Sequence, residues 1–345
     1  MIRYGIIGTG WITDTFIGGA MKTAELSLSA VYSRSEEKGR EFAEKHRAAA
    51  HGEEIAVFTD LEEMAKSDLL DGVYIASPNS LHYPQSKLFL NHNKHVICEK
   101  PITLWTEQLK ELQDLAKTRG LVYMEAIMMM HQPQLKALKE AIGKIGRIYT
   151  ARFDFSQLSS KYPLYMAGQL PNILNPAFGT GTLMDLGIYC IYLAVELFGK
   201  PEKMSIHSQF IDSGADISDE VVFSYPDRHV TITLSKAGQS RAGSEIIGDA
   251  GTVTIDLASQ LTDINLHFPD GSMEAVWGED TKIVLMGREA ADFYRWIVEG
   301  TDEWYEQCSE RAMEVCKILE ELRPMAGIEF TGEAVKPLKG GANAL

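Results

Sequence analysis

The segment Cys98-Glu99-Lys100-Pro101 places an ionisable amine directly after the apolar run 95–97. A lysine takes part in proton transfer only when its pKa falls towards neutrality. Burial next to a positively charged ring would have this effect, because both influences disfavour the ammonium form. A lysine after a strand is usually just solvated, but the neighbouring Glu99 and Pro101 favour an acid–base role, with Glu99 orienting Lys100.

A carboxylate and a phenol, Asp185 and Tyr189, lie four residues apart in the segment 178–189, which starts glycine-rich and becomes helical in pattern. A spacing of four puts both side chains on one face of a helix. Such a pair suits the binding of a hydroxyl or carbonyl substrate and the exchange of its proton. On spacing alone a second interpretation is equally good, in which Asp185 caps the first turn and Tyr189 is half-buried.

A glycine-rich turn follows the first apolar run of the chain, residues 2–7. Its sequence is Gly8-Thr9-Gly10-Trp11-Ile12-Thr13. In a dinucleotide-binding fingerprint the first glycine permits a tight turn and the second lets a pyrophosphate approach the backbone. Thr13 replaces the third glycine, so we expect a slightly wider approach of helix to strand. The turn predicts that a dinucleotide binds along residues 8–12 at the start of a helix.

The tip of the second strand indicates which dinucleotide binds. An acidic residue about 20 positions beyond the glycines would bind the 2′-hydroxyl of NAD. Ser33 and Arg34 stand there instead, and a hydroxyl with a guanidinium suits a 2′-phosphate. We therefore expect NADP as the preferred cofactor and NAD as the alternative. Glu36 and Glu37 weaken this expectation, since they could pair with a merely solvated Arg34.

A polar segment leaves the fourth strand at its carboxyl end, where open parallel sheets bind ligands. Its sequence is Ser77-Pro78-Asn79-Ser80-Leu81-His82. Asn79 could bind a ribose or a carboxamide, and Glu99 could bind a ribose as well. The same segment is also typical of a helix start, with Asn79 or Ser80 as the capping residue. We assign Ser77, Pro78, Asn79, His82, Glu99 and Lys100 to the cofactor site.

These residues must be positioned by a parallel sheet, because residues 1–125 alternate short apolar runs with helical patterns. After Pro101, for example, Leu109, Leu112, Leu115 and Ala116 form one apolar stripe. Six strands in a doubly wound order make a dinucleotide-binding, or Rossmann, domain. The strands are expected at 2–7, 26–32, 56–58, 72–76, 95–98 and 121–124.

The pattern changes in residues 126–332, which we assign to a second, α+β domain for substrate binding and oligomerisation. Apolar residues there recur with a period of two, in the runs 149–155, 204–210, 230–234, 253–257 and 264–268. This pattern predicts a large, mostly antiparallel sheet with one polar face. Helices, about 287–298 and 302–322, or a second subunit must cover its other face. Residues 333–345 form a tail.

Composition narrows the classes of partner. A formal charge of −15 argues against nucleic acid and anionic membrane, which are bound by clustered Lys and Arg. No membrane span or secretory leader is evident, so we expect a cytoplasmic protein. The four cysteines show no metal-site spacing, and we expect reduced thiols and no metal; they are Cys98, Cys190, Cys308 and Cys316.

Taken together, these residues resemble the glucose-fructose oxidoreductase/inositol dehydrogenase (Gfo/Idh/MocA) family. The Glu-Lys-Pro element is the most specific of four features that match in order across nearly the whole chain. Glu125-Ala126 and residues 246–251 also look like family features. The four are Gly8-Thr9-Gly10, Ser77-Pro78-Asn79 with His82, Glu99-Lys100-Pro101, and Gly181 through Asp185 to Tyr189.

The resemblance implies a nicotinamide-dependent oxidoreductase whose C-terminal sheet commonly forms the subunit interface. In such enzymes the lysine matching Lys100 assists proton transfer at the substrate hydroxyl. The residues matching Asp185 and Tyr189 bind that hydroxyl or exchange its proton. Many relatives carry His in place of Tyr189, and tyrosine is more similar to the dihydrodiol dehydrogenase and xylose dehydrogenase branch, which uses NADP on sugars or cyclic diols. His131 falls where relatives often show Arg, which leaves the substrate open.

The leading hypothesis is therefore reversible hydride transfer between NAD(P) and a hydroxyl or carbonyl carbon of a sugar, polyol or cyclic diol. Lys100 and Tyr189 would share the acid–base role. One alternative is a redox-silent regulator that binds the nucleotide, and another is a glycosidase that uses tightly bound NAD. Substrate-selecting side chains are expected in the loop 156–178, where Tyr162, Tyr165 and Asn172 are candidates.

Overall fold

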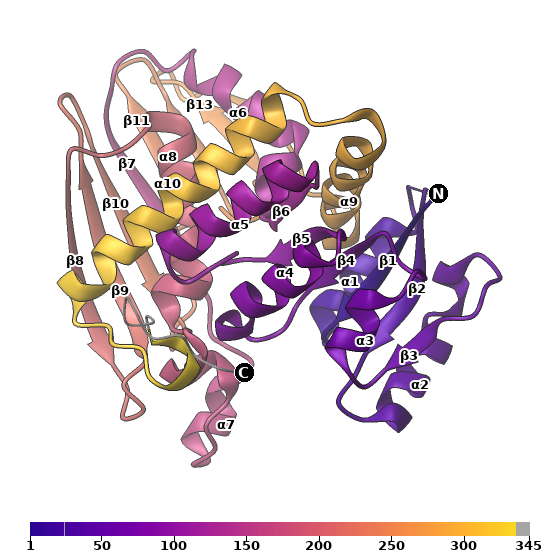
Figure 1. The fold of residues 1–345 in the computed structure, drawn as a ribbon. Coiled ribbons are helices and arrows are strands. Elements are labelled where there is room, and N and C mark those ends of the chain that lie inside the picture. Colours follow the sequence, from indigo (N-terminus) through magenta and orange to yellow (C-terminus); the bar gives the residue numbers. More distant parts are fainter. Residues whose placement is uncertain (24, 336–345) are drawn as a thin grey trace.

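The computed structural model describes residues 1–23 and 25–335, which form two sheets with their covering helices (Figure 1). The first sheet is parallel and six-stranded, in the order β3-β2-β1-β4-β5-β6. Strands β2 and β3 are added on one side of β1, and strands β4 to β6 are added on the other side. The predicted doubly wound sheet is therefore confirmed. Its strands are β1 Ile2–Ile7, β2 Leu26–Tyr32, β3 Ala56–Phe58, β4 Gly72–Ile75, β5 His95–Glu99 and β6 Tyr123–Ala126.

The connecting helices follow the expected pattern. They are α1 Trp11–Ala20, α2 Glu36–Lys45, α3 Leu61–Lys66, α4 His82–Asn91 and α5 Thr106–Arg119. The apolar stripe of α5 is buried at Leu109, Leu112 and Ala116. Strand β6 begins two residues later than predicted, because the Leu121 amide closes α5 by bonding back to the Ala116 carbonyl at 2.9 Å.

The second sheet has eight strands in the order β14-β13-β12-β11-β7-β10-β9-β8, and its β7–β10 pair is parallel while the other neighbours are antiparallel. The predicted mostly antiparallel sheet is therefore confirmed. Three of its strands, β9, β11 and β14, were not predicted from the period of two. In β9 the buried acids Asp216 and Asp219 interrupt the alternation of buried apolar side chains. The strands are β7 Ile148–Ser156, β8 Lys203–Phe210, β9 Asp216–Ser224, β10 His229–Ser235, β11 Ser244–Gly248, β12 Thr252–Ile255, β13 Ile264–His267 and β14 Met273–Trp277.

One face of this sheet carries helices. Helix α8, Ile188–Phe198, packs between the sheet and the long helix α10, Glu303–Ala326, and α6, Pro133–Ile142, lies near β14 (Figure 1). A short helix α7, Tyr162–Met166, projects at the bottom of the molecule in Figure 1, away from α6. Within the described residues, the stretch Pro176–Phe198 is apolar and long enough to cross a membrane, yet 78% of its most apolar window is buried inside the fold. It is therefore the central helix of the second core.

Helix α9, Lys282–Glu299, returns to the first sheet and crosses α1 (Figure 1). A Cβ atom on Gly19 would lie 2.6 Å from the Gly287 backbone nitrogen, so the two helices touch through glycines. Phe293 and Trp296 of α9 join the core beneath β1. The two predicted closing helices are thus α9 and α10, both longer than expected, and α9 ties the C-terminal part of the chain to the N-terminal sheet.

Candidate active site

The carboxyl ends of β4 and β5 open on a cavity of about 420 Å³ that the second sheet closes from the other side. From the first domain it is lined by Trp11, Ile12, Ala76, Ser77, Asn79, His82, Glu99 and Lys100. From the rest of the chain it is lined by Phe155, Gln157, Asp185, Leu186, Tyr189, Leu257, Ser259, Gln260 and Lys282. Most of the predicted cofactor residues thus share one space with the predicted catalytic residues.

Lys100 and Asp185 meet in this cavity although 85 positions separate them in the chain. The ammonium of Lys100 donates to the carboxylate oxygen Oδ1 of Asp185 at 2.6 Å and to its backbone carbonyl at 2.8 Å. It also lies 4.8 Å from the centre of the Tyr189 ring. The three residues predicted to handle the substrate hydroxyl are therefore in direct contact.

Lys236 is a second lysine on Asp185, and the sequence analysis missed it. It follows β10, and its ammonium donates to the carboxylate oxygen Oδ2 of Asp185. Its side chain is only 4% exposed. Lys236 directly follows a strand, as Lys100 does, but it lacks the neighbouring Glu and Pro that singled out Lys100, so its position after β10 was only a weak signal.

The charges in this cluster set the protonation states. Burial alone would raise the pKa of Asp185, but Lys100 and Lys236 outweigh it and hold that pKa well below its usual range. Burial alone would lower the pKa of Lys100, as the sequence analysis expected. The negative charge of Asp185, with Tyr189 and Glu99, outweighs burial, so the pKa of Lys100 is raised. Without a bound cofactor Lys100 is therefore a firmly held ammonium. The lowered pKa expected from sequence applies to Lys100 next to a positively charged ring and stays a prediction.

Tyr189 enters the cavity as a neutral phenol. Its ring packs against Phe155 at 5.7 Å between centroids, and burial raises the pKa of its hydroxyl. Asp185 lies in a π-helical turn, Leu183–Gly187, that runs directly into α8. π-turns of this kind are common at functional sites. The four-residue spacing thus predicted the shared location but not the local backbone.

Asp216 of β9 holds the start of this turn. Its carboxylate accepts from the Leu183 amide at 2.7 Å, and its backbone carbonyl accepts from the Thr182 hydroxyl at 3.1 Å. Gly181 has φ of +147°, and a Cβ there would collide with Oδ1 of Asp216. Asp219 lies close by, and burial together with the charge of Asp216 raises the pKa of Asp219 to about 9. Asp219 therefore keeps its proton at neutral pH, close to Asp216 and beneath the turn that carries Asp185.

Buried carboxyl groups also lie under the other side of the cavity. Glu99 accepts from the Tyr74 hydroxyl at 2.5 Å and from the Lys100 amide at 3.3 Å, and burial raises its pKa. Glu125 accepts from the Ile102 amide at 2.8 Å, and burial raises its pKa to about 7. These bonds fix the strand ends from which Lys100 projects.

The fingerprint turn has the geometry that a dinucleotide needs. Gly8 has φ of +101°, and a Cβ there would lie 2.5 Å from the Ala76 carbonyl oxygen, so only glycine fits. A Cβ on Gly10 would meet nothing within 4 Å, which leaves that side of the backbone open to a phosphate. Thr13, at the third-glycine position, is fully buried and donates its hydroxyl to the Gly8 carbonyl at 2.9 Å. The residues present therefore fit the diphosphate of a dinucleotide.

The tip of β2 carries the two donors expected for a 2′-phosphate, although the side chain of Ser33 is largely buried. The Ser33 hydroxyl oxygen accepts from the Ser35 amide at 3.3 Å, and Arg34 is exposed. Glu36, which weakened the NADP expectation, is paired with Arg40 at 2.6 Å instead. This tip therefore fits NADP.

The Ser77–His82 segment is braced by several contacts. The two ring nitrogens of His82 each lie 2.8 Å from a backbone carbonyl, of Pro101 and of Ser77. Asn79 donates to the Gly179 carbonyl at 2.9 Å. Neither Asn79 nor Ser80 caps a helix here, so that alternative is wrong: Pro78 and Leu81 occupy the cap positions without a side-chain bond.

The candidates in the loop 156–178 lie elsewhere. Tyr162 and Tyr165, of α7, stand with ring centroids 6.2 Å apart, and Tyr165 accepts from the Asp212 amide. Neither they nor Asn172 line the cavity. A substrate role for Tyr162 stays a prediction, whereas the polar lining residues Gln157, Ser259 and Gln260 were missed. They come just after strands β7 and β12.

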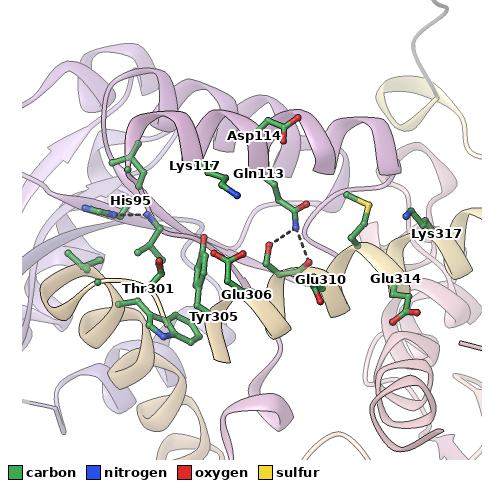
Figure 2. A pocket seen from close by; sticks show the side chains of 18 residues that line it. His95, Gln113, Asp114, Lys117, Thr301, Tyr305, Glu306, Glu310, Glu314 and Lys317 are labelled. Carbon is green, nitrogen blue, oxygen red and sulfur yellow. Dashed lines mark hydrogen bonds between the residues drawn. The ribbon is translucent and has the colours of Figure 1, made fainter. Parts of the chain in front are cut away.

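A larger hollow of about 810 Å³ lies between α5 and α10, remote from this chemistry. Figure 2 shows its rim of acidic and basic side chains, and Gln113 crosses it to donate to Ser309 at 2.9 Å. Residues labelled there include Asp114, Lys117, Glu306, Glu310, Glu314 and Lys317. None of the predicted cofactor or catalytic residues lines it, so its size alone does not make it the active site.

Comparison with known proteins identifies relatives along nearly the whole chain. The chain is 40% identical over 333 residues to scyllo-inositol 2-dehydrogenase (NADP(+)) IolU of Bacillus subtilis, covering 96% of this chain and 99% of that protein. It is 27% identical over 344 residues to mouse trans-1,2-dihydrobenzene-1,2-diol dehydrogenase, covering 95% and 98%. Among solved structures, the 3-ketoreductase KijD10 of Actinomadura kijaniata, in complex with NADP and TDP-benzene, superimposes with a TM-score of 0.83 at 20% identity, covering 94% and 98%.

Two family descriptions match consecutive parts of the chain. Residues 2–127 match the oxidoreductase family with an NAD-binding Rossmann fold, and residues 135–254 match the GFO/IDH/MocA C-terminal domain. The resemblance inferred from the Gly-rich turn and the Glu-Lys-Pro element is thereby confirmed. The chain belongs to the Gfo/Idh/MocA family of oxidoreductases.

Proposed function

We propose that this protein is an NADP-dependent oxidoreductase that transfers a hydride between the nicotinamide and a hydroxyl or carbonyl carbon of a polyol, sugar or cyclic diol. The observation that carries the proposal is the contact of Lys100 with Asp185 at 2.6 Å inside a cavity that also contains Trp11 and Ile12 of the fingerprint turn. Proton-transfer groups and a dinucleotide turn thus face one space. The names of the relatives, an inositol dehydrogenase and diol dehydrogenases, support the same reaction class.

The cofactor supplies or accepts the hydride when bound, and this chain manages the proton. Lys100 and Tyr189 share that role, because both project into the cavity and touch each other. Both carry their protons in the free protein, so the resting site is an acid that can protonate a carbonyl oxygen during reduction. In the oxidative direction one of these protons must leave first. Asp185 keeps the Lys100 ammonium in place and offers its carboxylate to a substrate hydroxyl.

The cavity suits a neutral, hydroxyl-rich substrate. Asn79, Gln157, Ser259 and Gln260 line it and provide both hydrogen-bond donors and acceptors. A cavity of about 420 Å³ must accommodate the nicotinamide end together with the substrate, which favours a small ring or chain over a polymer. We therefore place cyclic polyols, monosaccharides and diols ahead of larger glycans.

Self-association through the second sheet and a cytoplasmic location belong to the same proposal. Helices α8 and α10 cover one face of the sheet (Figure 1). The opposite face carries polar pairs such as Arg152 with Glu245 on neighbouring strands. We propose that this face, which lies away from α8 and α10, meets a second copy of the chain, and measurement of the oligomeric state in solution tests this. All four cysteines are free thiols, which supports a reducing compartment.

Two other functions of this fold have less support. A redox-silent regulator would need no proton relay, whereas Lys100, Asp185 and Tyr189 are in contact. A glycosidase with tightly held NAD would be expected to carry an acid at the tip of β2, where Ser33 and Arg34 stand.

The test is a fluorescence titration with NADPH and NADH, followed by turnover assays on inositols, inososes, sugars and diols. We expect tighter binding of NADPH and turnover of at least one polyol or its ketone. Binding without turnover across the panel would support the regulator, and NAD that co-purifies without exchanging would support the glycosidase.

A further inference from the structure

Lys282 is, with Lys100, the second lysine that lines the cavity, and it comes from the C-terminal part of the chain. It is the first residue of α9, and its ammonium lies 4.5 Å from the centre of the Trp11 ring. Trp11 is the first residue of α1 and directly follows the fingerprint glycine Gly10. The C-terminal part of the chain thus places a positive charge over the phosphate-binding turn.

This ammonium has no anionic partner in the free protein. Lys100 and Lys236 both bind Asp185, and Glu99 is bound by Tyr74. By contrast, Lys282 makes no hydrogen bond or ion pair within residues 1–23 and 25–335, and its ammonium contacts the Trp11 ring. The carboxyl groups of Glu99, Asp185 and Glu289 attract it only from a longer range. Burial also lowers the pKa of Lys282, which shows that its surroundings do not yet compensate the charge.

The position of Lys282 is fixed by packing rather than by a flexible loop. Helix α9 touches α1 where Gly287 meets Gly19, and Ile283 lies 3.7 Å from the position of a Cβ on Gly18. Trp296, further along the same helix, is buried in the first core. Because α9 cannot slide over α1 at these contacts, Lys282 is held opposite the fingerprint turn before any ligand arrives.

We propose that Lys282 is a ligand of the cofactor diphosphate, binding it from the side opposite the Gly8–Gly10 backbone. This inference rests on the proposed function. The Gly10 side of the turn is open, and Lys282 faces the same end of the cavity through Trp11. A polyol substrate is neutral and gives an unpaired ammonium nothing to neutralise, whereas a diphosphate carries the missing negative charge. When the cofactor binds, the ammonium leaves the weaker contact with Trp11 for phosphate oxygens.

The experiment compares the dissociation constants of NADPH for the wild type, Lys282→Met and Lys282→Arg, measured by fluorescence titration. A charge-assisted hydrogen bond predicts about a tenfold to hundredfold weaker binding for K282M. K282R, which keeps the charge, should lose much less. Affinity for NADPH should also fall less steeply with salt in K282M. Lys136→Met, at an exposed lysine of α6, is the matched control and should bind like the wild type.

Adenosine 2′-monophosphate keeps the 2′-phosphate of NADPH but lacks the diphosphate, so it tests whether Lys282 contacts the diphosphate. As a competitor of NADPH it should bind equally to the wild type and K282M. Equal NADPH binding by both proteins, or an equal loss for both ligands in K282M, would overturn the inference. A raised KM for the polyol with unchanged NADPH binding would assign Lys282 to the substrate instead and overturn it as well. Failure of the wild type to bind NADPH would instead reject the proposed function itself.

Discussion

Lys236 binds the carboxylate oxygen of Asp185 that Lys100 leaves free, so Asp185 lies between two ammonium groups. This arrangement explains why Asp185 stays ionised although it is largely buried. Under the proposed function the two lysines would have different roles, because Lys100 touches the Tyr189 ring and lines the cavity whereas Lys236 does neither. Lys236 acts through Asp185 and is therefore a positioning residue.

Lys236→Met should slow turnover about tenfold to a hundredfold while NADPH binding stays unchanged. Without the second ammonium the pKa of Asp185 rises, and its contact with Lys100 becomes the sole constraint on the carboxylate. The lower limb of the pH–rate profile should therefore move to higher pH. Lys203→Met, at an exposed position of β8, is the control. A lower rate with an unshifted profile would point to a purely structural effect.

Lys100→Met should abolish turnover, because it removes the ammonium that touches both Asp185 and Tyr189. The cofactor should still bind, since the fingerprint turn is intact and Lys236 still holds Asp185. The measurement is kcat together with the dissociation constant of NADPH. An unchanged kcat would exclude Lys100 from the mechanism, and loss of NADPH binding would mean that the substitution disturbs the fold.

The oxidation and reduction reactions should respond to pH differently. Lys100 and Tyr189 both have raised pKa values in the free protein, so both carry protons at neutral pH. Reduction of a carbonyl uses such a proton and should proceed at neutral pH, whereas oxidation of an alcohol should speed up as the pH rises and a base forms. Initial rates in both directions between pH 6 and about 10 test this. A flat profile in the oxidative direction would mean that neither residue loses its proton in the rate-limiting step.

Much of this site follows from the sequence, and what does not has a physical reason. Gly8, Gly10 and Lys100 stand at the carboxyl ends of parallel strands, which must meet at one edge of the sheet. That rule holds within one domain and says nothing about α9, whose return to α1 depends on long-range packing. The local sequence pattern around Lys282 therefore did not indicate that it lines the cavity. The same holds for the π-turn at Asp185, since its backbone is anchored by Asp216 from a distant strand.

Gly181→Ala should damage both stability and activity, because the new Cβ would collide with Asp216 and loosen the turn that carries Asp185. Gly52 is the matched control, since it also has a positive φ, +97°, but a Cβ there meets nothing within 4 Å. Backbone strain alone costs about 1–3 kcal/mol and is common to both variants. G181A should therefore lose more unfolding free energy than G52A in urea titrations, and only G181A should lose kcat. Equal losses in the two variants would show that the Asp216 contact is unimportant.

The stability of the protein should fall as the pH rises from about 5 to 9, in part through Asp219. In the unfolded chain this carboxyl has its ordinary pKa of 3.8, whereas in the folded protein the pKa is raised to about 9. Between these values the folded state holds a proton that the unfolded state has lost, so raising the pH favours unfolding, by at most about 1.4 kcal/mol per pH unit. Asp219→Asn cannot ionise and keeps a hydrogen-bond donor for Asp216, so its unfolding free energy should depend less on pH. Asp114→Asn, at a side chain that is 65% exposed, should follow the wild type. If urea titrations at pH 6 and 9 gave the wild type and D219N the same pH dependence, Asp219 would not be the group that keeps a proton in the folded state.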